Sequence, residues 1–173
     1  AFDQLPPDRR TIVVIVAEVA RGGLTQAVLA IEEAHGRIEE ALALMATAQR
    51  PIIYSGGGVI NSGPAASESL RALAKATGWP VTSTLMGLGA FPASSPQWLG
   101  MVGMHGSFES NNAMHDCDVM LCVGARFDDR VTGRLDAFSP RSKKIHIDID
   151  PSSINKNVRV DIPVVADCGK ALD

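Results

Sequence analysis

The fold is decided by residues 80–133, which read PVTSTLMGLGAFPASSPQWLGMVGMHGSFESNNAMHDCDVMLCVGARFDDRVTG. Three glycine-rich segments lie in this stretch, at residues 85–92, 100–106 and 123–133. The first and the third directly follow apolar runs of the β type. An open parallel sheet presents backbone amides to a phosphate-bearing ligand in this way, at the carboxyl edge of its strands. We therefore expect the rest of the chain to support a ligand-binding sheet edge.

Short strands and helices alternate on both sides of this stretch, which is typical of βαβ units and of a mainly parallel sheet covered on both faces. The predicted fold class is α/β, a three-layer, doubly wound, Rossmann-like sheet of about six strands in a single domain. The expected strands are residues 11–17, 51–54, 80–84, 118–123, 144–150 and 162–165. The expected helices are residues 25–34, 37–48, 64–77, 108–115 and 168–172, with a short one beginning in 151–156.

Composition places the chain among globular proteins and argues against several classes of function. Of the 173 residues, 46% are hydrophobic and 20% are charged, which is enough apolar material for a sizeable core. A formal charge of −3 and an aromatic content of 5% disfavour a nucleic-acid surface. No apolar run approaches the roughly 18 residues of a membrane span. Cys117, Cys122 and Cys168 lack metal-site spacing and are interpreted as reduced packing residues, which favours a cytoplasmic location.

The first candidate loop is Ser55–Gly63, with three consecutive glycines after a short apolar run. Glycines at this place let a pyrophosphate or an adenosine approach the backbone closely. The dinucleotide fingerprint G-x-G-x-x-G fails, because Asn61 occupies its last position, and no acidic residue follows about twenty positions later. A nucleotide-approach loop and a tight strand-to-helix turn both remain open as explanations.

Three further positions carry polar residues suited to a ligand. His105 stands between glycines and is expected to contact a bound ring or phosphate rather than to transfer a proton. In residues 124–130, two arginines flank two aspartates, a pattern that suits an ion-pair network, a clamp on an anion or a solvated loop. A metal site is disfavoured there, since no third acidic ligand is near. Asp148 stands at the carboxyl end of one expected strand and Asp167 follows another, and carboxylates in such places commonly meet ribose or adenine donors.

Taken together, these residues resemble the catalytic large subunit of acetohydroxyacid synthase (acetolactate synthase), a thiamine-diphosphate enzyme. The resemblance covers about residues 50–172 and rests on four motifs in the family's order and spacing. They are LMGLGAFP at 85–92, GMVGMHG at 100–106, GARFDDRVTG at 124–133 and HIDIDP at 146–151.

The resemblance implies that this chain is the middle one of the family's three domains. That domain is a parallel sheet that holds FAD in an extended form, as a structural cofactor without a redox part in the main reaction. The implied FAD contacts are Gly56, Gly57, Gly58, Thr84, Leu85, Met86, Val102, Gly103, Met104, His105, Gly124, Ala125, Arg126, Asp128, Arg130, Val131, Asp148, Ile149 and Asp167.

The same resemblance implies what the chain lacks. In the family, the glutamate that activates thiamine lies in the preceding domain, and the motif for Mg²⁺ and the diphosphate lies in the following one. The full enzyme condenses two pyruvates, or pyruvate and 2-oxobutyrate, in branched-chain amino-acid synthesis. This chain alone is therefore expected to have no catalytic residue, no metal site and no activity. The implied partners are the flanking thiamine-binding domains, further copies of the full subunit and a regulatory small subunit.

Residues 1–36 depart from the family's pattern, and the run 11–17 has no counterpart in it. We interpret them as a linker or an atypical N-terminal segment before a domain spanning 37–173. Three other functions remain possible. The chain could be the middle domain of a related thiamine enzyme that binds ADP or no nucleotide. It could be a stand-alone nicotinamide-binding domain, which the failed fingerprint disfavours, or a domain that serves mainly to contact its neighbours.

Overall fold

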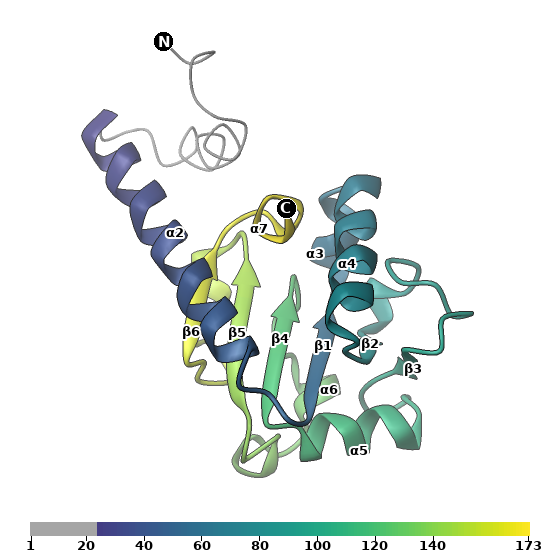
Figure 1. Cartoon of the computed structure of the whole chain (residues 1–173). Helices are drawn as coiled ribbons and strands as arrows, with labels where there is room; N and C mark the ends of the chain where they lie inside the picture. Colours follow the sequence, from purple (N-terminus) through teal and green to yellow (C-terminus); the bar gives the residue numbers. More distant parts are fainter. Residues whose placement is uncertain (1–23) are drawn as a thin grey trace.

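Six parallel strands form one sheet in the order β3-β2-β1-β4-β5-β6 (Figure 1). This computed structural model describes residues 24–173, so the strand expected at 11–17 lies outside the described residues. The strands are β1 (Pro51–Ser55), β2 (Val81–Ser83), β3 (Trp98–Met101), β4 (Val119–Val123), β5 (Lys143–Asp148) and β6 (Ile162–Val165). The predicted α/β fold with a parallel sheet is confirmed.

The two faces of the sheet support two separate apolar cores. Alternate residues of a strand point to opposite faces, so Ile53 and Leu121 enter one core while Ile52 and Met120 enter the other. Both faces of the central strands are therefore apolar, and β4 is buried along its whole length. This explains why the central strands read as continuous hydrophobic runs in the sequence.

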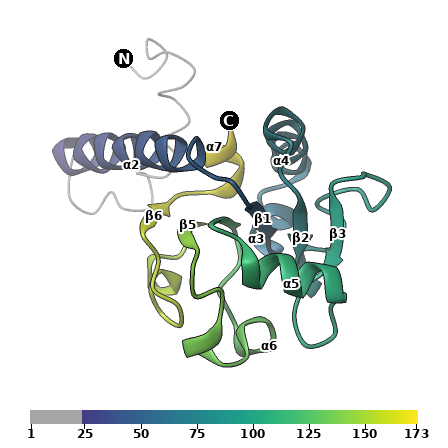
Figure 2. The same cartoon turned by 60° about the horizontal axis from the view of Figure 1, so that its bottom comes forward.

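Helices cover both faces, as Figure 2 shows, with α2, α4 and α7 on one side and α5 and α6 on the other. The longer helices are α2 (Leu24–Met45), α4 (Pro64–Thr77) and α5 (Phe108–Asp116), and the shorter ones are α3 (Gly57–Asn61), α6 (Asp129–Thr132) and α7 (Cys168–Leu172). Single 3₁₀ turns lie at η2 (Leu85–Gly87), η3 (Leu135–Ala137) and η4 (Pro151–Ser153). Among residues 24–173, no helix has the length and apolar character to cross a membrane.

Helix α4 has the bounds that the sequence predicts, because its ends are chemically marked. Pro64 occupies the first turn, and Gly78 adopts a left-handed conformation (φ 74°) that ends the helix. The expectation of two helices at 25–34 and 37–48 is wrong, since α2 runs through Gly36 without a break. A glycine inside a helix costs about 1 kcal/mol relative to alanine, which is too little to end a helix by itself. The domain boundary expected at residue 36 thus lies inside α2.

The strand order reverses between β1 and β4, so the chain winds outward from this pair in both directions. In doubly wound sheets the loops at the carboxyl ends of such a pair diverge and leave a crevice, where ligands bind. The loops that flank the reversal here begin at Gly56 and at Gly124. The topology therefore directs attention to the same glycine-rich segments as the sequence.

Candidate functional site

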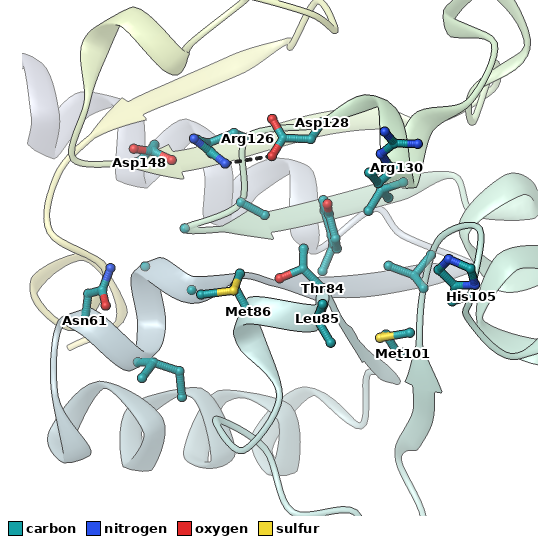
Figure 3. A pocket seen from close by; sticks show the side chains of 18 of the residues that line it. Asn61, Thr84, Leu85, Met86, Met101, His105, Arg126, Asp128, Arg130 and Asp148 are labelled. Atoms are coloured by element: carbon teal, nitrogen blue, oxygen red, sulfur yellow. Dashed lines mark hydrogen bonds and ion pairs between the residues drawn. The ribbon is translucent and has the colours of Figure 1, made fainter.

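A cavity of about 780 Å³ opens at the carboxyl edge of the sheet, across the point where the strand order reverses. Sites for cofactors and small ligands commonly measure roughly 300–1,000 Å³. Its lining comes from the ends of β1, β3, β4 and β5 and from α3, η2 and α6 (Figure 3). The lining residues are Tyr54, Gly57, Gly58, Ile60, Asn61, Thr84, Leu85, Met86, Met101, Val102, Met104, His105, Gly124, Ala125, Arg126, Asp128, Arg130, Val131, Asp148 and Ile149.

The fold brings nearly all the residues singled out in the sequence to this one cavity. Every predicted contact except Gly56, Gly103 and Asp167 lines it, although the five segments that supply them are far apart in the chain. Chance would not gather side chains from five loops around one cavity. The cavity is therefore the candidate functional site, and the assignment of individual ligand contacts stays a prediction.

Gly58 and Gly124 hold the two loops of the crevice in direct backbone contact. The amide of Gly58 donates to the carbonyl oxygen of Gly124 at 3.0 Å. A Cβ added at Gly58 would lie 2.6 Å from the Cα of Gly124, and Gly124 itself has a φ of 62°. Neither position has room for a side chain. Close packing between loops thus requires these glycines, and both also remain on the cavity wall.

Gly103 and Asp167 do not line the cavity and have roles within the protein. A Cβ at Gly103, where φ is 109°, would lie 2.6 Å from the carbonyl oxygen of Arg130. One carboxylate oxygen of Asp167 accepts a hydrogen bond from the Ser62 hydroxyl at 2.6 Å. The other accepts from the Lys170 amide at 3.1 Å and caps α7. Both residues therefore support the frame of the site.

Phe127 explains how Arg126 and Asp128 both come to face the cavity. Its side chain is buried, and its backbone adopts a left-handed conformation (φ 53°) that is uncommon for a bulky residue. The ring packs between Tyr54, at a centroid distance of 5.6 Å, and His146, at 5.0 Å. With Phe127 anchored inward, its two neighbours point to the cavity, where Arg126 donates to Asp128 at 2.8 Å (Figure 3). This ion pair was one of the predicted alternatives for the loop.

Asp148 and Asn61 lie at one end of the cavity, and Met101, His105 and Arg130 lie at the other (Figure 3). Asp148 is largely buried, and one of its oxygens accepts a hydrogen bond from the Asp150 amide at 2.9 Å. Between the ends, Leu85 and Met86 are exposed apolar side chains on the wall. The site is elongated, with a carboxylate at one end, cationic groups further along and thioethers beside them.

One histidine, His105, lines the cavity, and its side chain forms no hydrogen bond with another described residue. In the described part of the chain, no three His, Cys, Asp or Glu side chains gather as metal ligands would. The three cysteines are free and buried, which confirms their interpretation as packing residues.

Tyr54, Ile60, Asn61 and Met101 also line the cavity, and sequence reasoning did not find them. Tyr54 sits in a strand whose residues all read as core, and Met101 belongs to β3, which was expected to be a loop. Asn61 was noted only as the residue that breaks a fingerprint. Its place in the sequence, three residues after Gly58, was the available signal.

Comparison with known proteins agrees with this arrangement. Residues 38–173 match the family described as "Thiamine pyrophosphate enzyme, central domain". The chain is 49% identical over 138 residues to the acetolactate synthase large subunit of Haemophilus influenzae, covering 80% of this chain and 24% of the relative. For the probable acetolactate synthase large subunit of Methanocaldococcus jannaschii, identity is 53% over 136 residues, 79% of this chain and 23% of the relative. The chain thus spans about a quarter of the length of these relatives.

Proposed function

The chain belongs to the family of thiamine pyrophosphate enzyme central domains, and we propose that it is the FAD-binding domain of an acetolactate synthase large subunit. The observation that carries the proposal is the gathering of the predicted flavin contacts around one cavity at the sheet's reversal point. Overall identity of 49% over 138 residues with one acetolactate synthase large subunit supports the same proposal.

The cavity fits an extended dinucleotide in shape and in chemistry. Gly57 and Gly58 on one wall present backbone without side chains to the cavity, and a Cβ at Gly57 would lie only 3.1 Å from that of Met86. Arg126 and Arg130 offer guanidinium groups to a diphosphate. The apolar side chains Leu85 and Met86 suit the face of an aromatic ring system. Asp148, at the far end, can accept from ribose hydroxyls.

The bound flavin would supply no step of the main reaction, and the residues of this chain would hold it as part of the structure. The enzyme's chemistry would come from flanking thiamine-binding domains, since the chain spans about a quarter of its relatives. Met104, which lines the cavity, is 64% exposed, and Phe108 at the start of α5 is 77% exposed. In the full subunit, a neighbouring domain would cover these side chains. The relatives' names say "large subunit", and we extend the proposal to a smaller regulatory partner and to self-association of the full subunit.

Titration of the purified chain with FAD tests the proposal. Quenching of flavin fluorescence and a rise in melting temperature are expected in the micromolar range, with weaker binding of ADP and none of NAD. Tighter binding of ADP than of FAD would favour the middle domain of a different thiamine enzyme. No response to either ligand at millimolar concentration would overturn the binding site proposed for this chain.

A further inference from the structure

We propose that Asn111 is a positioning residue for one end of the cavity, and that it thereby gives the site a preference for FAD over ADP. The inference rests on the proposed binding function and deepens it. Asn111 is a half-buried residue of α5 and does not itself line the cavity. It also lies outside the four sequence motifs, so its role follows from its contacts alone.

The side-chain amide of Asn111 pairs with both backbone polar groups of Gly103. Its Oδ1 accepts a hydrogen bond from the Gly103 amide at 3.1 Å, and its Nδ2 donates to the Gly103 carbonyl oxygen at 3.0 Å. Nδ2 also donates to the carbonyl oxygen of Ser107 at 3.0 Å. A carboxamide is the side-chain group that carries an acceptor and two donors side by side. A carboxylate or an aliphatic group of the same size would therefore lose at least one bond to Gly103.

Gly103 passes this restraint on to the cavity wall. It lies between Val102 and Met104, which both line the cavity. Its φ is 109°, and a Cβ there would lie 2.6 Å from the carbonyl oxygen of Arg130, so the two segments touch with no room for a side chain. The amide of Met104 donates to the same carbonyl oxygen at 2.9 Å. By holding Gly103, Asn111 therefore fixes the wall segment that begins at Met104 against the loop of Arg130.

The helix that carries Asn111 is itself tied to the preceding strand. Ser107 caps α5 by accepting a hydrogen bond from the Ser110 amide at 3.1 Å, and its hydroxyl donates to the Leu99 carbonyl oxygen at 2.8 Å. The Ser110 hydroxyl donates to the carbonyl oxygen of Met101 at 2.6 Å. The two serines thus hold β3, whereas Asn111 holds the loop that follows it. Asn111 acts from a fixed base.

The restraint acts at one end of an elongated cavity (Figure 3). Met101 and His105 lie at this end, Asp148 lies at the opposite end, and Arg126 stands between them. In the proposed binding mode, Asp148 accepts from the ribose of the adenosine half, and the diphosphate follows it along the cavity. The sugar alcohol chain and the flavin, which ADP lacks, then extend toward His105. A shift of the wall at Gly103 should therefore weaken the binding of FAD and not that of ADP.

The test compares the full 173-residue chain with Asn111→Ser. A serine can still donate to the Ser107 carbonyl oxygen, four residues earlier on the helix, but it lacks the two amide atoms that meet Gly103. Calorimetric titration measures the dissociation constants of both ligands. We expect the Kd for FAD to rise about three- to tenfold and the Kd for ADP to stay unchanged.

Asn112→Ser is the matched control, because Asn112 is the next residue of α5 and is exposed. It should leave both dissociation constants unchanged. Asn111→Asp is a second test variant, since a carboxylate still accepts from the Gly103 amide but cannot donate to its carbonyl oxygen. It should again weaken FAD binding selectively.

The ratio of the two dissociation constants separates positioning from a general effect on the fold. Equal losses of FAD and ADP affinity in the Asn111 variants, or failure of both variants to fold, would make Asn111 a residue of the fold alone and overturn the inference. An unchanged FAD affinity would overturn it as well. With normal binding by the wild type, all three results leave the proposed function intact. Absence of FAD and ADP binding by the wild type would overturn both.

Discussion

His146 Nε2 lies 2.8 Å from the carbonyl oxygen of Ala125 and ties the loop after β4 to the neighbouring strand β5. A carbonyl oxygen only accepts hydrogen bonds, so the proton of the neutral imidazole must be on Nε2. The same oxygen accepts from the Cys122 thiol, with a sulfur–oxygen distance of 3.2 Å. Two buried side chains in register therefore anchor the backbone directly before Arg126. The cavity wall depends on this anchor for its shape.

The neutral form of His146 predicts a pH dependence of stability. Burial lowers the pKa of His146 below its ordinary value of 6.5, against smaller opposing effects of the Ala125 bond and the Asp148 charge. Between the folded pKa and about 6.5 the unfolded chain binds more protons than the folded one. The contribution of His146 to the free energy of unfolding should thus be fully present above about pH 6.5. As the pH decreases from about 6.5, this contribution should be lost, by at most about 1.4 kcal/mol per pH unit.

Urea unfolding between pH 5 and pH 8 measures this effect. His146→Gln keeps a side-chain donor for Ala125 but cannot titrate, so its unfolding free energy should lack the slope just below pH 6.5. The comparison uses slopes, because the variant's absolute stability will differ. Parallel pH profiles for the two proteins would contradict the assignment.

Gly58→Ala should destabilise the protein and weaken ligand binding together. The new methyl group would lie 2.6 Å from the Cα of Gly124, within the backbone contact that joins the two loops of the crevice. Overpacking of this kind typically costs about 1–3 kcal/mol. Gly36→Ala is the control, because nothing lies within 4 Å of an added Cβ there and its helix would gain about 0.5–1 kcal/mol. Thermal unfolding measures the stability of both variants, and FAD titration measures their affinity. A Gly58→Ala protein as stable as the wild type would contradict the close contact between Gly58 and Gly124.

The elements of this fold that could be predicted from the sequence are those whose signals are local. Pro64 and Gly78 mark the ends of α4 because each residue's own backbone preference sets them. The predicted contacts that line the cavity were assigned through a resemblance. They share one physical trait, since all of them lie at or after the carboxyl end of a strand. Strand β3 was missed because it is a half-exposed edge strand that contains Gly100 with a φ of 103°. Its residues are apolar, but the glycine among them made the segment read as a loop.

Long-range contacts account for what the sequence could not supply. Tyr54 reads as a buried strand residue, and only the folded structure shows that it also belongs to the lining of the cavity. Asp167 follows a strand as a ligand-binding carboxylate would, but Ser62, 105 residues away in the chain, occupies one of its oxygens. Spacing along the chain cannot predict such partners.

The chain should form no acetolactate from pyruvate when supplied with thiamine diphosphate and Mg²⁺. The proposal places the groups that react with thiamine on flanking domains, and the described residues include no cluster of three potential metal ligands. A colorimetric assay for acetoin after acid treatment measures the product. Joining the chain to flanking domains of a relative's large subunit is the positive control. Turnover by the chain alone would contradict the division of labour proposed here.

Arg126→Ala should weaken FAD binding without unfolding the protein. The Arg126 side chain is 67% exposed and its pair with Asp128 is on the surface, so the pair contributes at most about 1 kcal/mol to stability. A guanidinium bond to a ligand phosphate is worth more, about 1.5–3 kcal/mol, or roughly a ten- to hundredfold rise in Kd. The affinity of the wild type should also fall with added salt more steeply than that of the variant.

Arg134 provides the matched control for Arg126. It forms the same kind of pair, two residues along the chain, with Asp136 at 2.6 Å, and its side chain is 80% exposed. Arg134 does not line the cavity. Arg134→Ala should therefore match Arg126→Ala in melting temperature and match the wild type in FAD affinity. Equal FAD affinities for the two variants would mean that Arg126 pairs only with Asp128 and does not bind the ligand. The charge that holds the diphosphate would then come from another lining residue, and Arg130 would be the next residue to replace.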